Sequence, residues 1–312
     1  MKLKRELLVQ PAGEMWKMIR VELNEDPSTR DRDLLAIKEW LRKEPHLPDE
    51  WEDQPLMTFL RGCSFSLEKC KRKLDMYFTM RSACPEFFTN RDVTKPVLKE
   101  VLNNKVQGPP LPGLTPNGRR VIMIRGIHPN VESHEILESL KLALMVGDVR
   151  LHEEKEGVAG DVYILDGAVL GPSVLTKISP STLKKFIICV QEAYPVKLKE
   201  VHVVNTSPVI ERFVNLIKPL FKEKIRKRIF VHKNVSDLYK YVPQEMLPVE
   251  YGGQGGNMND LQEQWSNKLL EYRDWFKSQE PIRANEALRP GKPTNYDELF
   301  GIDGSFRQLT ID

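Results

Sequence analysis

Short apolar runs alternate with helical patterns along the middle of this chain, and this alternation constrains the fold more than any other feature. Runs typical of β-strands occupy residues 121–127, 162–165, 201–204 and 229–231. Helical patterns lie between and around them, at residues 135–151, 181–194 and 207–221. Strands that alternate with helices predict an α/β domain. Because the runs are almost entirely apolar, we expect the strands to be buried on both faces.

The first hundred residues lack such runs and predict helices only. Apolar side chains share one helix face at Leu34, Leu35, Ile37, Trp40 and Leu41, and further helical patterns cover residues 56–60 and 67–80. The stretch 107–118 that follows this region contains four prolines and three glycines. Proline cannot donate a hydrogen bond to a neighbouring strand, so this stretch is expected to be a loop or an edge strand.

Three parts are expected along the chain. They are a small all-helical N-terminal lobe at 1–95, an α/β domain at 96–256, and a C-terminal helix with an extended tail at 257–312, which begins after the glycine-rich break at 252–256. The proline and glycine content of the tail is typical of disorder. It nevertheless carries apolar residues that it can bury: Leu299, Phe300, Ile302, Phe306, Leu309 and Ile311.

The composition is that of a globular cytoplasmic protein. A chain of 312 residues with 40% hydrophobic residues can bury a sizeable core. Its beginning lacks the pattern of a signal peptide, and no window approaches 18 apolar residues, so we expect no membrane-spanning helix. The four cysteines, at positions 63, 70, 84 and 189, follow no zinc or disulfide pattern and indicate reduced thiols. One reactive thiol is the alternative.

No catalytic or metal site is indicated. The six histidines show no HExxH or HxxxH spacing, and the chain has no GxSxG, P-loop or GxGxxG motif. His202 lies between valines on an expected strand, where a structural hydrogen bond is the simplest role. We therefore expect a protein that is not an enzyme and that holds no metal and no cofactor other than a bound ligand.

An apolar helix joins directly to the densest cationic run of the chain. The apolar stripe of this helix is wider than a core needs, and it consists of Val209, Ile210, Phe213, Val214, Leu216, Ile217, Leu220 and Phe221. The cations that follow are opposed by Glu223 alone, although the whole chain carries a net charge of only +3: Lys218, Lys222, Lys224, Arg226, Lys227, Arg228 and Lys233. So local a charge predicts a docking patch.

An anionic membrane is the partner that this patch favours. If the helix continues, Lys224 and Arg228 lie on one face, and each cation near an anionic leaflet contributes about 1 kcal/mol. The alternative is an ordinary solvated face. Nucleic acid is disfavoured, because the run lacks interleaved aromatic side chains apart from Phe221 and Phe230.

Several ordered blocks of the chain resemble one known family. In the N-terminal part they are LLAIKEWLRKEP (34–45), FLRGCSFSLEKCKRKL (59–74) and PEFF (85–88). In the main part they are VYILDGAV (162–169), ISPSTLKK (178–185), QEAYPVKLKEVHVVN (191–205), IKPLFKEKIRKRI (217–229) and LPVEYGG (247–253). In these blocks the chain resembles the CRAL-TRIO family of lipid-binding proteins, in the branch that contains alpha-tocopherol transfer protein and cellular retinaldehyde-binding protein.

The resemblance implies a helical N-terminal lobe of the CRAL-TRIO type, followed by a lipid-binding domain. In that family a sheet floor and covering helices enclose an apolar cavity, and a mobile helix closes it as a lid. By position the lid corresponds to residues 205–221. Its apolar members would be Val209, Ile210, Phe213, Ile217 and Leu220.

The cavity positions carried over from the family are mostly apolar. They are Leu140, Ala143, Leu144, Gly147, Asp161, Tyr163, Leu165, Leu170, Phe186, Cys189, Val190, Val196, Leu198 and Val201. Asp161 and Tyr163 are the polar exceptions, and polar groups on a cavity wall need a ligand, a water or each other. If they face inward, the ligand has a polar end; the alternative places Asp161 in solvent at the mouth of its strand.

The resemblance also implies a cationic cleft for phosphoinositide headgroups. Its positions correspond to Arg61, Lys197, Lys224 and Arg228. Cys63 stands where the relative has a further basic residue, which weakens the expected preference for phosphoinositides.

Taken together, these features predict a cytoplasmic carrier that associates peripherally with membranes. It would bind one tocopherol-, retinoid- or carotenoid-like lipid and transfer it at anionic, phosphoinositide-containing membranes. The alternative is a lipid-sensing regulatory or scaffolding module that acts through a protein partner. The sequence leaves the cargo and the oligomeric state open.

Overall fold

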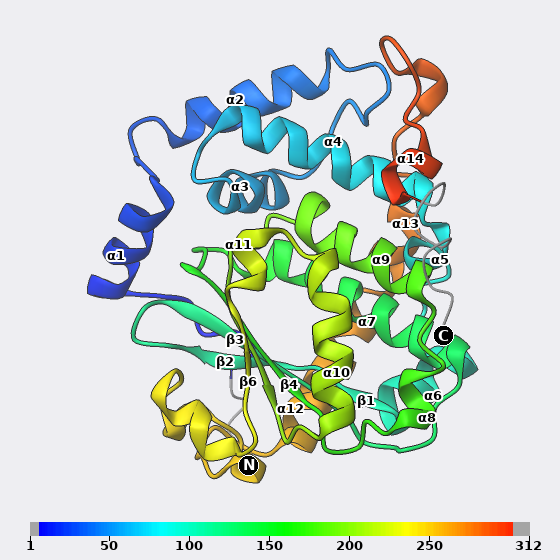
Figure 1. The fold of residues 1–312 in the computed structure, drawn as a ribbon. Coiled ribbons are helices and arrows are strands. Elements are labelled where there is room, and N and C mark those ends of the chain that lie inside the picture. Colours follow the sequence, from blue (N-terminus) through cyan, green and yellow to red (C-terminus); the bar gives the residue numbers. More distant parts are fainter. Residues whose placement is uncertain (1–5, 302–312) are drawn as a thin grey trace.

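The computed structural model describes residues 6–301. The N-terminal part is helical, as the periodicity predicts, and Figure 1 shows most of its helices as a layer above the sheet. The helices are α1 (Gly13–Leu23), α2 (Arg30–Leu41), α3 (Asp53–Gly62), α4 (Leu67–Ala83), α5 (Pro85–Phe88) and α6 (Pro96–Asn104). Leu74, Tyr77 and Phe78 of α4 are fully buried, because their spacing of three and four residues brings them to one face.

Six strands form one mixed sheet. They are β1 (Val106–Gln107), β2 (Pro110–Leu114), β3 (Arg119–Gly126), β4 (Gly160–Asp166), β5 (Leu198–Val204) and β6 (Ile229–Val231). The order is β1-β3-β4-β5-β6, with β2 also paired to β3; β3 to β6 run parallel, whereas β1 and β2 are antiparallel to β3. The proline-rich stretch 107–118 therefore lies at the edge of the sheet, as predicted.

The crossover helices follow the predicted pattern with two differences at their ends. They are α7 (Ser133–Glu153), α8 (Pro172–Leu175), α9 (Pro180–Ile188), α10 (Pro208–Ile217) and α11 (Glu223–Arg226). After α9 the chain forms a π-helical turn, η1 (Cys189–Ala193), and Lys73 Nζ donates to the carbonyls of Gln191 and Tyr194 beside it. The helix expected at 207–221 instead ends in a 3-10 turn, η2 (Lys218–Leu220), because Pro219 cannot donate within an α-helix.

The C-terminal part, after β6, consists of 3-10 turns and helices, and its last helix packs against the helical lobe. Three 3-10 turns, η3 (Val235–Lys240), η4 (Gln244–Met246) and η5 (Val249–Tyr251), precede α12 (Met258–Glu271), α13 (Arg273–Gln279), η6 (Glu286–Leu288) and α14 (Tyr296–Phe300). The expected extended tail thus contains a short helix whose Phe300 is buried in the core of the helical lobe. The other apolar tail residues named above, Ile302, Phe306, Leu309 and Ile311, lie outside the described residues.

The two faces of the sheet have different neighbours. Register pairs Ile122 with Tyr163 and Tyr163 with Val201, so these side chains form one row across the face that carries α7 and α10. The opposite face contributes Val121, Met123, Val162, Ile164 and Val204 to a core that the 3-10 segment and α12 complete. Ile210 and Val214 of α10 pack against Val203, on the same face as the row. Helices α7 and α10 therefore cover one face of the sheet, and the 3-10 segment and α12 cover the other.

The helical lobe and the α/β part share one core. Its buried residues come from α2, α3 and α4 and also from α7, η1 and α14. At its centre the fully buried Asp148 carboxylate accepts hydrogen bonds from Tyr77 and Tyr194, 3.0 and 2.6 Å away, and pairs with Arg91. Burial and this carboxylate raise the pKa of Tyr194. The expected boundary near residue 95 is therefore crossed by both apolar and charged contacts.

Candidate functional site

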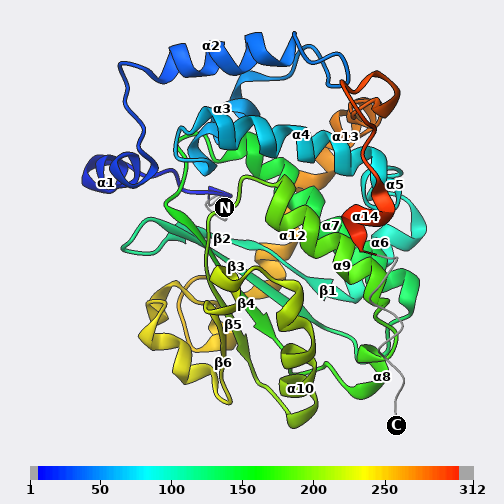
Figure 2. The ribbon, with the colours of Figure 1, turned by 45° about the horizontal axis from the view of Figure 1, so that its top comes forward.

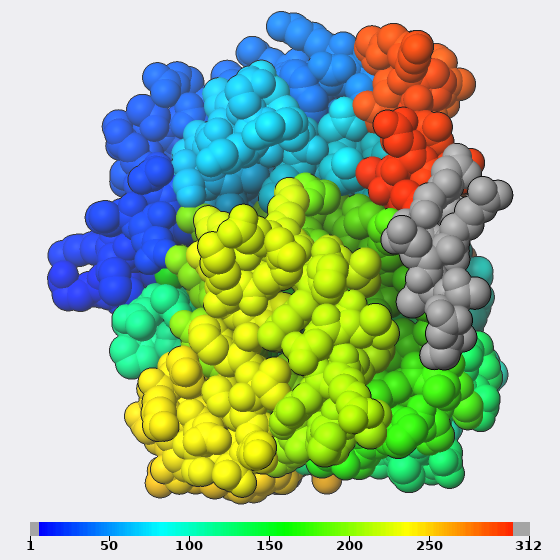
Figure 3. Space-filling view, in the orientation of Figure 1, coloured from blue at the N-terminus to red at the C-terminus, as the bar shows by residue number. Residues whose placement is uncertain are grey.

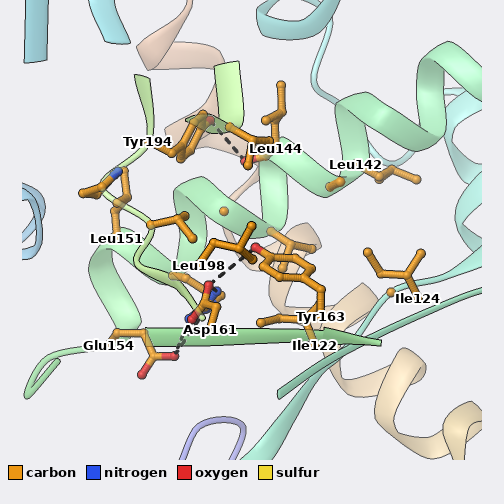
Figure 4. Close-up of a pocket in the computed structure, with 18 of the residues that line it drawn as sticks. Ile122, Ile124, Leu142, Leu144, Leu151, Glu154, Asp161, Tyr163, Tyr194 and Leu198 are labelled. Carbon is orange, nitrogen blue, oxygen red and sulfur yellow. Dashed lines mark hydrogen bonds and ion pairs between the residues drawn. The ribbon is translucent and has the colours of Figure 1, made fainter. Parts of the chain in front are cut away.

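A cavity of about 300 Å³ lies between the sheet and α7. One face of α7 lines it with residues spaced three and four apart, Ser139, Leu142, Ala143, Val146 and Gly147, and Arg150 continues this face. Figure 4 shows Ile122 and Tyr163 on the strand side, with Leu144 and Tyr194 on the opposite side. Such a space, apolar with a few polar groups, has the character of a small-molecule site.

Most of the cavity residues expected from the sequence line this space. They are Ala143, Leu144, Gly147, Asp161, Tyr163, Leu165, Phe186, Val190, Val196, Leu198 and Val201. Three expected residues lie elsewhere. Leu140 packs against the core of the helical lobe, Cys189 is fully buried in that core, and Leu170 packs against α10.

The cavity also contains residues that the sequence analysis did not include. Ile122 and Ile124 of β3 line it, and the register places them beside Tyr163 and Leu165. Arg150 lines it from α7, and Phe221 lines it from the segment that follows α10. The sequence signal for the two isoleucines was the two-residue alternation of β3. It shows that they share one face of the strand, but it does not show which of the two faces lines the cavity.

The polar end of the cavity is a closed set of charged groups. Arg150 donates to both oxygens of Asp161, at 2.7 and 2.8 Å, and to Glu154 at 3.2 Å. Glu154 also accepts from the buried Arg120, at 2.9 and 3.0 Å. Burial alone would raise the pKa of Glu154, but Arg120 and Arg150 hold it below its ordinary value. Two guanidinium groups and two carboxylates therefore neutralise one another.

Asp161 consequently faces inward and is not in solvent. Its side chain is buried, and besides Arg150 it contacts the Tyr163 hydroxyl, which lies 3.5 Å from Oδ2. This is a long hydrogen bond. Burial and the Asp161 carboxylate raise the pKa of Tyr163, so the hydroxyl stays protonated. It is placed to exchange its weak bond for one to a ligand.

The cavity extends to the place where the helical lobe meets the segment before β5, and Gly62 and Pro195 line it there. At Gly62 a Cβ would lie 2.0 Å from the carbonyl oxygen of Pro195, so only glycine fits this contact. Arg61, expected in the phosphoinositide cleft, is buried and ion-paired with Glu25 at 2.9 Å. Lys197 is half-buried; burial, followed by the neighbouring Lys199, lowers its pKa. Arg61 therefore presents no free charge in this conformation.

In the segment expected to be a lid, some apolar side chains pack against the protein and others are exposed to solvent. Ile210 and Val214 are buried against the sheet, and Phe213 and Ile217 are half-buried. Val209, Leu216 and Leu220 are exposed. None of the five expected lid residues lines the cavity, although Phe221 does. Part of the wide stripe thus faces something other than protein, in agreement with its pattern.

The cationic run forms an exposed edge beside this helix, and Figure 3 shows the surrounding segment across the middle of one face of the molecule. Lys222 pairs with Glu192 at 2.6 Å and Lys227 with Glu223 at 2.7 Å. Lys224 and Arg226 are exposed and form no ion pair within residues 6–301.

Arg228 differs from its neighbours in this run. Helix α11 ends at Arg226, so Lys224 and Arg228 do not share a helical face. The Arg228 guanidinium is partly buried and donates to the Leu198 carbonyl. It therefore joins the cationic edge to β5, whereas Lys224 and Arg226 remain without an ion pair within residues 6–301.

Other candidate chemistry is sparse in the described part of the chain. Residues 6–301 contain no cluster of histidine, cysteine and acidic side chains that could hold a metal ion. None of their helices is long and apolar enough to span a membrane. The four cysteines are unpaired and buried. His202 is buried and hydrogen-bonded to His232 and Glu200, at 2.9 and 3.0 Å.

Comparisons with known proteins agree with this geometry. A family model described as "CRAL/TRIO domain" matches residues 93–253, and one described as "Pinta-like, UBA domain" matches residues 26–98. The chain is 31% identical to "Alpha-tocopherol transfer protein-like" of Mus musculus over 93% of its length and 85% of the relative. It is 28% identical to "Clavesin-2" of Rattus norvegicus over 75% and 72% of the two chains.

Among solved structures, the crystal structure of Sfh5 covers 81% of this chain and 92% of that chain, with a TM-score of 0.47 and 16% identity, too low to support any argument. The first family match is different in kind, because it includes the whole sheet and α7 and spans more than half of the chain. By this match, and by its identity to the mouse relative over nearly its whole length, the chain belongs to the CRAL/TRIO family.

Proposed function

We propose that this protein is a carrier that holds one hydrophobic lipid in its cavity and exchanges it at anionic membranes. Membership of the CRAL/TRIO family supports lipid carriage rather than catalysis, as does a relative named for tocopherol transfer. The observation that carries the proposal is the cavity itself, which is lined mostly by apolar side chains of α7 and the sheet and has charged groups at the end that contains Arg150. Burial of a lipid chain there contributes about 0.8 kcal/mol per methylene.

The polar end favours an uncharged lipid of the tocopherol, retinoid or carotenoid type. Arg150 is already satisfied by Asp161 and Glu154, so it is not available for a carboxylate or a phosphate at this end of the cavity. A buried charge without a partner would cost several kcal/mol. The long bond of the Tyr163 hydroxyl to Asp161 leaves this pair available to a hydroxyl or carbonyl group.

Exchange at membranes is supported by the surface beside the cavity. Exposed Leu216 and Leu220 lie next to the unpaired cations Lys224 and Arg226. Apolar side chains next to cations are the pattern of a peripheral membrane surface. A cytoplasmic protein that docks reversibly on anionic membranes, including those with phosphoinositides, would use such a surface.

Filling the cavity tests the proposal. We expect Ala143→Trp and Val190→Trp to abolish loading of a tocopherol or retinol probe, because the indole ring takes the place of the lipid. Val249→Trp is the matched control, since Val249 is exposed and does not line the cavity. Loading is measured by fluorescence titration, and mass spectrometry of lipid extracted from the purified protein identifies the natural cargo. Normal loading of both cavity variants would refute the assignment.

A further inference from the structure

The cavity continues beyond α7 to the C-terminal helix α12. Six neutral residues of α6, β1, the loop after β1 and α12 line this end, which we call the α12 arm: Leu102, Val106, Gly108, Gln262, Trp265 and Leu269. The CRAL/TRIO match ends at residue 253, and α12 begins at Met258. The helix that forms one wall of this arm therefore lies outside the matched domain.

Hydrogen bonds hold α12 against α6 and the edge of the sheet. Gln262 Nε2 donates to the Leu102 carbonyl at 3.0 Å, and Gln262 Oε1 accepts from the Gly108 backbone N–H at 3.2 Å. Trp265 Nε1 donates to the Pro110 carbonyl at 3.2 Å, and its ring is buried in one apolar cluster with Leu102. The polar side-chain atoms of the arm are thus bonded to the backbone, and a ligand in the arm would contact hydrocarbon.

The two sides of the cavity differ in charge. Tyr163 lies on β4, and Figure 4 shows Ile124 of β3 and Leu198 of β5 on opposite sides of it. The side toward β5 includes the charged residues Arg61 and Lys197, whereas the side beyond β3 is the neutral α12 arm. Hydrocarbon next to a charged group costs free energy, because it removes water from that group. A lipid whose polar group bonds to Tyr163 therefore extends its tail toward α12.

We propose that the α12 arm is the subsite for the end of the cargo's hydrocarbon tail, and that Trp265 and Leu269 limit the length of tail that the protein accepts. The proposal rests on the proposed function, because it assigns the lipid tail to a part of the same cavity. Adjacent strands lie about 4.8 Å apart, so the arm at β1 begins about 10 Å from β4, within the length of a lipid tail. The packed side chains of the arm cannot admit further methylenes without strain. The ligand class is therefore a lipid with one uncharged polar group and one flexible tail of limited length.

A series of straight-chain primary alcohols, from decanol to docosanol, tests the subsite. Each alcohol is titrated against bound retinol, and the loss of retinol fluorescence reports its affinity. For the wild type, each added methylene should raise the affinity about fourfold until the chain fills the arm, and beyond that length the affinity should stop rising.

Leu269→Ala should move this limit to longer alcohols, because the shortened side chain leaves room at the wall. The first alcohol beyond the wild-type limit should bind this variant about fourfold more tightly than it binds the wild type. Leu270→Ala is the matched control, since Leu270 lies on the same helix but is exposed and does not line the cavity. The solubility of an alcohol is the same for every variant, so a displaced limit comes from the protein.

Val106→Phe keeps the test decisive if Leu269→Ala does not fold, because Val106 lines the arm and is only half-buried. Its larger ring should move the limit to shorter alcohols. An unchanged limit in the folded variants, with retinol still bound, would overturn the proposal and leave the proposed function intact. A failure of the proposed function would show differently, because the wild type would then bind neither retinol nor any alcohol, and the subsite would be refuted with it.

Discussion

Arg150 connects the cavity to the stability of the fold, because a single guanidinium satisfies two acidic groups. It holds Asp161, at the start of β4, and Glu154, at the end of α7. Without this arginine both carboxylates would be buried with fewer donors. The polar end of the cavity is thus built from charged groups that already satisfy one another, and the Tyr163 hydroxyl beside them can bond to a ligand.

We expect Asp161→Asn to lower the free energy of unfolding by about 3–5 kcal/mol, because the change removes one charge of a buried pair and leaves the other. Urea titration followed by circular dichroism measures the effect. Asp274→Asn provides the control, since Asp274 is exposed and should change stability by less than about 0.5 kcal/mol. A small effect of Asp161→Asn would mean that water reaches Arg150.

A second residue-scale prediction concerns the pair His202 and His232. Burial lowers the pKa of both below the ordinary 6.5; Glu200 opposes this shift for His202, and Asp237 opposes it for His232. The His202 and His232 rings also pack against Tyr241. Below pH 6.5 the unfolded chain therefore binds more protons than the folded one, and the stability present above 6.5 is lost as the pH falls through the lowered pKa values.

We expect the melting temperature of the wild type to fall between pH 6.5 and pH 5, and to fall less steeply in His232→Gln. His128→Gln is the control, because His128 is exposed and should leave the slope unchanged. Differential scanning fluorimetry across this pH range measures both slopes. Parallel curves for all three proteins would exclude the histidine pair as the cause.

At the scale of elements, α10 and α11 differ in what they contact, although they follow each other closely in the sequence. Helix α10 covers the sheet with Ile210 and Val214, whereas α11 leaves Lys224 and Arg226 free. Arg228, only two residues later, is tied to the Leu198 carbonyl. Cations that are neighbours in the sequence therefore differ in whether their side chains are free to contact a membrane.

We expect the double variant Lys224→Glu with Arg226→Glu to lose at least tenfold in affinity for phosphatidylserine vesicles, because each cation near an anionic leaflet contributes about 1 kcal/mol. Added salt should weaken the wild type as well. Lys99→Glu is the control, since Lys99 is exposed on α6. Equal sedimentation of all variants with vesicles at low salt would rule out this edge as the docking surface.

Periodicity predicted most elements correctly, and the reasons for its failures are physical. Strands such as β4 are buried on both faces, so their composition reveals the strand but not which face meets the cavity. For this reason Ile122 and Ile124 were missed. The pairing of Arg61 with Glu25 joins residues 36 positions apart, and nothing local signals it. Pro219, in contrast, was a readable signal for the early end of α10.

At the scale of the whole molecule, the two lobes share one core. Tyr77 and Arg81 of the helical lobe and Tyr194 of the α/β part converge on Asp148, and a common apolar core surrounds them. A family resemblance predicts both lobes but not how strongly they depend on each other. That dependence comes from contacts between distant segments.

We expect urea unfolding followed by tryptophan fluorescence and by circular dichroism to give coincident curves, because neither lobe keeps its core without the other. Residues 1–95 alone should not fold. Asp148→Asn should lower the free energy of unfolding by about 3–5 kcal/mol, and the two curves should move together. Separate transitions for the two signals would show that the lobes unfold independently.

The contact of Gly62 with Pro195 has a kinetic consequence. Backbone meets backbone there, so the wall of the cavity at this point is formed by the main chain and not by side chains that can rotate aside. Rotamer changes take nanoseconds, whereas displacement of packed helices takes microseconds to milliseconds. Under the proposed function, a bulky cargo would pass this point only when these packed segments move apart. Its spontaneous leakage into water should follow the frequency with which the lobes separate, whatever the strength of binding inside.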